Sequence, residues 1–216
     1  MKNKYLILLS MLYLSFLLTS MILSYRFVTI GPILTVSSIF VIPFSYSISD
    51  IIAEVYGYKV IKSVIFNSFI SAACVFFLLW LLIKLPAQQK YDSYVMSYNV
   101  VFGNALRVFA SNFIAMFFGV LLNSYLIVRL KLLVDGRLFF VRSLFSSAIG
   151  EFLFTCVVVF FVQYGVSSSS DILEMICISF AMKLSFTVIS SFIVAFIVKP
   201  IIEKADGGDE SIIVNE

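Results

Sequence analysis

The sequence lacks histidine and is poor in charged residues. Of its 216 residues none is His, only 12% are charged, and 62% are hydrophobic. Soluble domains carry about 25% charged residues, so a chain this apolar cannot cover a core of its own with a polar surface. The absence of histidine also excludes a His-ligated metal site and a histidine general base. We therefore predict an integral membrane protein, and we expect neither a cofactor nor a metal centre.

Cysteines and long polar stretches are also scarce. The three cysteines lie within apolar runs and show no CxxC spacing, so we interpret them as small packing residues. The longest polar stretches, residues 86–99 and 203–216, are too short to form a domain. No Walker motif is present, so the chain itself does not hydrolyse ATP. We predict one membrane domain over residues 1–202 and a polar, disordered cytoplasmic tail over residues 203–216.

Six apolar segments are long enough to cross a bilayer, because a spanning helix needs about 20 apolar residues. The apolar runs do not alternate with polar residues at period two, so we expect no strand pairs. The sequence therefore predicts an all-α bundle of six transmembrane helices. The first segment could instead be a signal peptide, but its apolar run is long and no A-x-A-like site follows it. The predicted helices cover residues 5–25, 28–48, 62–84, 100–128, 143–164 and 172–198.

The basic residues indicate how these helices are oriented. If the N-terminus is cytoplasmic, ten Lys and Arg residues fall in cytoplasmic segments and three in outer loops. This asymmetry follows the positive-inside rule. We therefore predict that both termini are cytoplasmic, and that the basic clusters are a topology signal and not a nucleic-acid surface.

Three ionisable residues, Arg107, Glu151 and Lys183, lie within predicted spans, where a charge costs roughly 2.5–3.5 kcal/mol on insertion scales. Each has Gly, Ser or Thr one helical turn away on the same face. The third span adds Ser63, Asn67 and Ser71 at the same spacing. Such stripes favour helices that surround a polar cavity for a small solute. Two simpler interpretations remain open, in which Arg107 and Glu151 form a structural ion pair and Lys183 extends to the membrane surface.

The segment VIPFSYSISDIIAEVYGYKV, residues 41–60, places two acids, Asp50 and Glu54, four residues apart. They share one face if the second helix continues through them and ends at Gly57. Pro43 could kink this helix and free a backbone carbonyl. An interrupted helix with acids at its end suits a ligand site. The alternative is that both acids are solvated in a loop and balanced by nearby lysines.

This segment resembles the signature of the queuosine precursor transporters, six-span inner-membrane proteins that are also grouped as vitamin-uptake-like transporters. The matching residues are Pro43, Asp50, Glu54, Tyr56 and Gly57. VFGNALRVFASNFIA is similar to the family's fourth span and RSLFSSAIGEFLFT to its fifth, and Lys183 falls where the last span carries a lysine. The resemblance covers about residues 28–199.

The sequence departs from this family at several positions. Asn123 stands where the family usually has Asp, and Glu151 stands at a Gln position. Phe154 replaces the Asp of an Asp-Thr pair, of which Thr155 remains, and the Thr-Pro of the last span is missing. Two expected acids are lost and one is gained, which indicates either a relocated acid or a changed substrate.

The resemblance implies import of deazaguanine bases, the queuosine precursors salvaged for tRNA modification, by a multi-pass protein of the cell inner membrane. A carboxylate can accept the N–H donors of a guanine-like edge, and aromatic residues can hold its flat face. The expected partners are this purine-like small molecule and membrane lipid, with no nucleic acid and no enzymatic activity. We predict substrate binding by Asp50, Glu54, Asn67, Asn104, Arg107, Glu151 and Lys183.

The same features allow an alternative function, the substrate-binding membrane subunit of a vitamin or nucleobase uptake system that works with a separate ATPase. The energy source is also open at this point. Glu151 could carry a coupled proton, or it could stay paired with a base. Facilitated diffusion followed by metabolic trapping is a third option, and the sequence leaves the oligomeric state open.

Overall fold

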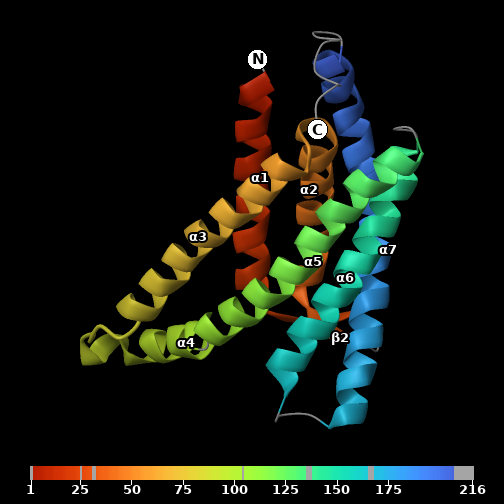
Figure 1. Ribbon diagram of the computed structural model, residues 1–216. Helices are drawn as coiled ribbons and strands as arrows, with labels where there is room; N and C mark the ends of the chain where they lie inside the picture. The colour runs from red at the N-terminus through yellow and green to blue at the C-terminus, as the bar shows by residue number, and fades with distance from the viewer. Residues whose placement is uncertain are drawn as a thin grey trace.

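The computed structural model describes residues 2–24, 26–30, 33–103, 105–134, 138–164 and 168–206. Within these residues, six helices are long and apolar enough to cross a membrane (Figure 1). The predicted all-α membrane bundle of six spans is therefore confirmed. The start of α1 and the end of α7 lie at the same end of the bundle, as an even number of spans requires. The candidate spans are Tyr5–Leu23, Ser37–Tyr56, Tyr58–Leu82, Phe109–Leu133, Phe139–Phe161 and Ser169–Ile189.

The first span, α1 (Lys2–Leu23), presents one stripe of side chains to the bundle. Leu9, Tyr13, Leu17 and Met21 are spaced four residues apart and are buried, whereas the neighbouring Leu8 is exposed. Residues four apart share one face of a helix, and α1 packs against α2. The outward face of α1 is apolar, which suits contact with lipid.

The next segment corrects the predicted second span, residues 28–48. Its first part is an antiparallel hairpin of β1 (Phe27–Ile30) and β2 (Ile33–Val36), followed by the 3-10 helix η1 (Ser37–Phe40). The prediction that the chain has no strand pairs is therefore wrong here. The β-branched residues of FVTI and ILTV favour an extended backbone, and the Gly-Pro sequence between them is a turn signal.

The central helix of the bundle is α2 (Ile42–Tyr56). It contacts α1, α3, α5, α6 and α7, and 72% of its span is buried, against 39% or less in every other candidate span. Pro43 lies in the first turn of α2, where its missing N–H breaks no helical hydrogen bond, so the predicted kink is wrong. As predicted, the helix continues through Asp50 and Glu54 and stops at Gly57.

Gly57 separates α2 from α3 (Tyr58–Leu82). Its φ of 82° with ψ of 170° is a backbone conformation that favours glycine. The chain therefore changes direction, and α3 tilts away from α2 toward η2 (Gln89–Tyr91) and α4 (Asp92–Phe102) (Figure 1). The next span lies within α5 (Ala105–Leu133), so the predicted fourth span at 100–128 begins too early.

The bundle is completed by α6 (Phe139–Gln163) and α7 (Ser169–Asp206). α5 and α6 cross closely at two glycines: a Cβ on Gly119 would lie 2.7 Å from the carbonyl oxygen of Gly150, and one on Gly150 would lie 2.7 Å from that of Gly119. Small residues permit such close helix crossings. The helix α7 continues to Asp206, and residues 207–216 lie outside the described part, so the domain boundary at residue 202 stays a prediction.

Candidate functional site

Polar residues of α2 meet polar residues of α5, α6 and α7 inside the bundle. Later residues of α2 contact earlier residues of α6, so these two helices run antiparallel. Three acids, Glu54, Asp50 and Glu151, follow one another along this contact. We call these acids, together with Tyr46 and their hydrogen-bond partners, the polar column.

Glu54 forms the end of the polar column nearest Gly57. Its carboxylate oxygens accept hydrogen bonds from Arg142, at 2.9 Å from Nη1 and 3.1 Å from Nη2, in a bidentate geometry. Lys131 Nζ lies 3.3 Å from Oε1 and also donates to the backbone carbonyl of Glu54. Glu54 is thus neutralised by two cations and links α2 to α5 and α6.

Asp50 lies one helical turn deeper and is fully buried. Its Oδ1 accepts a hydrogen bond from Asn123 Nδ2 at 2.6 Å, and its Oδ2 accepts one from Ser147 Oγ at 3.1 Å and another from Ser143 Oγ. No Lys or Arg of the described residues forms an ion pair with Asp50. Because Asp50 is buried and Glu54 is paired within the bundle, the alternative of two solvated loop acids is wrong.

Tyr46 precedes Asp50 by one turn of α2 and lies against the crossing of α5 and α6. A Cβ on Gly119 would lie 2.9 Å from its hydroxyl, and one on Gly150 would lie 3.1 Å from its ring. The hydroxyls of Tyr46, Ser45 and Tyr13 are buried and have no hydrogen-bond partner among the described residues. Buried polar groups are normally paired, so these hydroxyls have unused hydrogen-bonding capacity.

Glu151 on α6 is the third acid of the polar column and is fully buried. Its Oε1 accepts a hydrogen bond from Thr187 Oγ1 of α7 at 2.5 Å, whereas its Oε2 has no hydrogen-bond partner among the described residues. Lys183, one turn before Thr187, interacts electrostatically with Glu151 and donates to Thr155 Oγ1 at 3.0 Å. Its ammonium also lies 4.8 Å from the ring centroid of Phe154. Since Lys183 is buried, its predicted alternative of extending to the membrane surface is wrong.

The Glu151 part of the column offers complementary hydrogen-bonding groups in apolar surroundings. Glu151 Oε2 is an acceptor, the Lys183 ammonium carries three donors of which Thr155 takes one, and the Tyr46 hydroxyl can donate or accept. Nowhere in the described ranges do three or more His, Cys, Asp or Glu residues gather as metal ligands. Glu151, Lys183 and Tyr46 can therefore hydrogen-bond a small polar organic solute.

Two of the predicted binding residues do not join the polar column. Asn67 lies on the exposed face of α3, so the prediction that its stripe points inward is wrong. Arg107 is exposed, and its Nη2 donates to the carbonyl of Phe161 at 3.3 Å. Phe161 follows Glu151 by ten residues, about 15 Å along a helix, so the structure does not bring Arg107 to Glu151, either as a binding group or as a structural ion pair. Asn104 lies outside the described residues.

Sequence reasoning missed several residues of the column. Ser143, Ser147 and Glu151 are spaced four residues apart on α6, and Tyr46 precedes Asp50 by four, so helical periodicity could have found Ser143 and Tyr46. Arg142 instead fits the topology signal of the sequence. No local pattern pairs it with Glu54, which lies 88 residues away in the chain.

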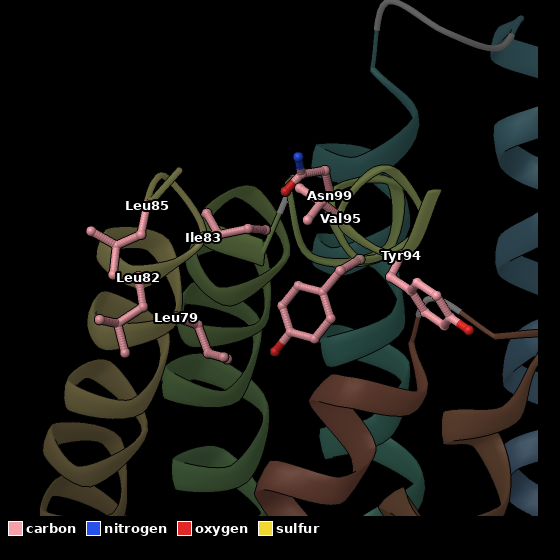
Figure 2. Close-up of a pocket in the computed structure, with 8 residues that line it drawn as sticks. Leu79, Leu82, Ile83, Leu85, Tyr94, Val95 and Asn99 are labelled. Carbon is pink, nitrogen blue, oxygen red and sulfur yellow. The ribbon is translucent and has the colours of Figure 1, made fainter. Parts of the chain in front are cut away.

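A separate groove lies at the far end of α3. It has a volume of about 370 Å³ and is bordered by Leu79 and Leu82 of α3 on one side and by Tyr94 of α4 on the other (Figure 2). Nearby, Lys84 Nζ lies 3.4 Å from the ring centroid of Trp80. Aromatic and basic residues together are typical of a membrane–water interface. The residues that line this groove carry no charge.

One family model matches residues 36–198, which are 163 of the 216 residues of the chain and include α2 and the polar column. No curated protein and no solved structure gives a significant match. A transporter family agrees with a multi-pass membrane protein and with a buried site for a small molecule. Since the match covers more than half of the chain, the protein belongs to the family described as "Putative vitamin uptake transporter".

Proposed function

We propose that this protein imports deazaguanine bases across the cell inner membrane, and that Glu151 and Lys183 bind the base. Membership of the transporter family supports the movement of a small molecule across a membrane. The likeness of the α2 segment to the queuosine precursor transporters supports this substrate. The observation that carries the proposal is the Oε2 atom of Glu151, a buried carboxylate oxygen with no hydrogen-bond partner among the described residues.

The groups around Glu151 match the edge of a guanine-like ring. Such an edge presents neighbouring N–H donors, which a carboxylate accepts in the same way as it accepts a guanidinium. The ring carbonyl can accept a hydrogen bond from Lys183, and Phe154 and Tyr46 supply aromatic faces nearby. Glu151 lies three residues before Phe154, which replaces a family Asp, and so Glu151 takes the role of a relocated acid.

The structure is closed around this site, because Glu151 is fully buried and Lys183 is 6% exposed. Lys183 and Thr187 both belong to α7, which packs on α2 and α6 and is the least buried candidate span. Separation of α7 from α2 and α6 would expose Glu151 and Lys183 together. In the proposed cycle this movement alternates access between the two faces of the membrane.

The test is uptake of a radiolabelled deazaguanine base by cells that cannot synthesise it. Glu151→Gln keeps the size of the side chain and removes its charge. The variant should raise KM about 10–100-fold, because hydrogen bonds to charged groups contribute about 1.5–3 kcal/mol. The matched control is Glu174→Gln, which changes an exposed acid of α7. Membrane levels measured by immunoblot exclude poor insertion.

Normal uptake by Glu151→Gln would contradict the proposed site, and no uptake by the parent protein would contradict the proposed substrate. Proteoliposomes that contain only this chain address the ATPase-linked alternative. Uptake or exchange of the base in these vesicles shows that no separate ATPase is needed. A strict requirement for an added ATPase would replace the proposal by that alternative.

A further inference from the structure

Asp50 differs from the other acids of the polar column in its partners. Glu54 is held by two cations, and Glu151 interacts with Lys183, but the partners of Asp50 are all neutral. Its three donors are the side chains of Asn123, Ser143 and Ser147. A buried carboxylate without a cation is costly in its charged form. Binding one positive charge, as a proton or a cation, would therefore relieve a larger energetic cost at Asp50 than at the other two acids.

The packing around Asp50 admits a proton more readily than a metal ion. Asn123 Nδ2 lies 2.6 Å from Oδ1, and Ser147 Oγ lies 3.1 Å from Oδ2. A metal ion would have to sit between the carboxylate and these groups, and at these distances no space is left for it. A proton adds to a carboxylate oxygen without displacing any of the three side chains.

The charged and titratable groups around Asp50 come from most of the helices that pack on α2. They are Tyr13 of α1, Tyr46 and Glu54 of α2, Lys131 of α5, Arg142 and Glu151 of α6, and Lys183 of α7. At the start of α3, Lys59 and Lys62 are exposed, and Tyr58 packs edge-on against Tyr125 of α5. The three cations of α5, α6 and α7 are engaged by Glu54 or lie beside Glu151, so none of them replaces a proton on Asp50.

The position of Asp50 links it to the proposed substrate site. Its partner Ser147 precedes Glu151 by one turn of α6. The buried hydroxyl of Tyr46 has no hydrogen-bond partner among the described residues and lies within electrostatic range of both acids. The charge of Asp50 acts on Glu151, and two buried carboxylates repel each other when both are charged. A proton on Asp50 therefore leaves Glu151 as the charged acid of this pair, and this favours the N–H donors of a substrate.

We propose that Asp50 carries the proton that drives uptake, an inference that rests on the proposed function. Proton and base enter together from the outer face, the proton as the O–H of the Asp50 carboxylic acid and the base on Glu151. Both leave on the cytoplasmic face, and the Asp50 carboxylate is restored. The protein is then a proton symporter.

The experiment uses the full chain in proteoliposomes with the membrane potential clamped at zero. Two activities are measured: counterflow exchange of a labelled deazaguanine base without a pH gradient, and its net accumulation when the outside is one pH unit more acidic. One proton per neutral base allows up to about tenfold accumulation, since a tenfold ratio corresponds to about 1.4 kcal/mol. Asp50→Asn should keep counterflow and lose accumulation, whereas the exposed control Asp171→Asn should keep both.

Several results would overturn the inference. Counterflow by the parent protein without any response to the pH gradient removes the coupling and leaves the proposed function intact. Accumulation driven by a sodium gradient at constant pH replaces the proton by a metal ion, and accumulation by Asp50→Asn at the parent level removes the role of Asp50. Absence of counterflow by the parent protein contradicts the proposed function itself, and this inference with it.

A second variant covers the case in which Asp50→Asn loses both activities. Ser143→Ala keeps the acid and removes one donor that stabilises its charged form. If Asp50 carries the proton, the pH of half-maximal uptake moves upward in this variant while maximal counterflow is kept. An unchanged pH profile would overturn the inference, because a purely structural serine has no reason to shift it.

Discussion

The ion pair between Glu54 and Arg142 gives the sharpest prediction about stability. Arg142 is 3% exposed and donates two hydrogen bonds to Glu54, whose side chain is 11% exposed. Arg142→Met keeps the bulk of the side chain and leaves a buried carboxylate. Removing one partner of a buried pair costs about 3–5 kcal/mol. Because Lys131 still lies 3.3 Å from Glu54, we expect about 2–3 kcal/mol.

The control is Lys131→Met, which removes the other cation of the same carboxylate. The Lys131 side chain is 41% exposed, and exposed pairs contribute about 0–1 kcal/mol. In a chain of this size 1 kcal/mol corresponds to about 2–4 °C in Tm. The expected losses are therefore about 4–12 °C for Arg142→Met and at most about 4 °C for Lys131→Met.

The assay is thermal stability in detergent, read as the fraction of protein that still elutes as a single species in size-exclusion chromatography after heating. A double variant, Glu54→Gln with Arg142→Met, removes both charges and should recover part of the loss, because no buried charge is then left unpaired. Equal losses for Arg142→Met and Lys131→Met, or no recovery in the double variant, would refute the reasoning about burial.

Two further predictions follow from the packing. Gly150→Ala should lower Tm and uptake, because the new Cβ would lie 2.7 Å from the Gly119 carbonyl oxygen and such overpacking costs about 1–3 kcal/mol. Alanine is otherwise a better helix former than glycine. A rise in Tm would therefore contradict the close crossing of α5 and α6. Asn67→Leu changes the exposed face of α3, away from the polar column, and exposed substitutions usually change the free energy of unfolding by no more than about 0.5 kcal/mol. Uptake of the deazaguanine base should therefore stay at the parent level. A tenfold loss of uptake would place Asn67 on the substrate path.

The number of spans could be predicted from the sequence because the length of an apolar run is a local property. The boundaries were less accurate where a local signal was weak. Residues 27–36 are as apolar as a helix and lack period-two alternation, yet residues 27–30 pair with residues 33–36 as a hairpin. Their β-branched residues and the Gly-Pro sequence between them favour this outcome. The break at Gly57 was predictable, because a glycine between two apolar runs is a clear signal.

The inward faces of the helices were harder to predict than the helices themselves. In α3 the stripe that contains Asn67 resembles that of α6, but it faces outward, because a membrane helix with apolar residues all round has no sequence feature that fixes its rotation. The partners of Asp50 lie between 73 and 97 residues away in the chain, and no local spacing encodes such contacts. The pair of Glu151 and Lys183 was found because both are charges within spans, which are rare enough to be informative.

The arrangement of α2 explains how this chain tolerates three buried acids. α2 is the least apolar of the six candidate spans and also the most buried, whereas α1 and α3, the most apolar, bury only 28% of their spans. The more apolar helices thus separate the polar helix from lipid, and its acids meet serine, asparagine, threonine and basic side chains.

A gain in stability does not explain why acids occupy these buried positions. A protein with well-packed apolar residues in place of a buried ion pair is often equally stable or more stable. Glu54 fits a structural role, since both of its oxygens are bound by cations. Asp50 and Glu151 do not fit this role, because one has no cation and the other has an oxygen without a partner in the described part of the chain. A contribution to stability does not explain these two acids, whereas the proposed binding of a proton and a base does.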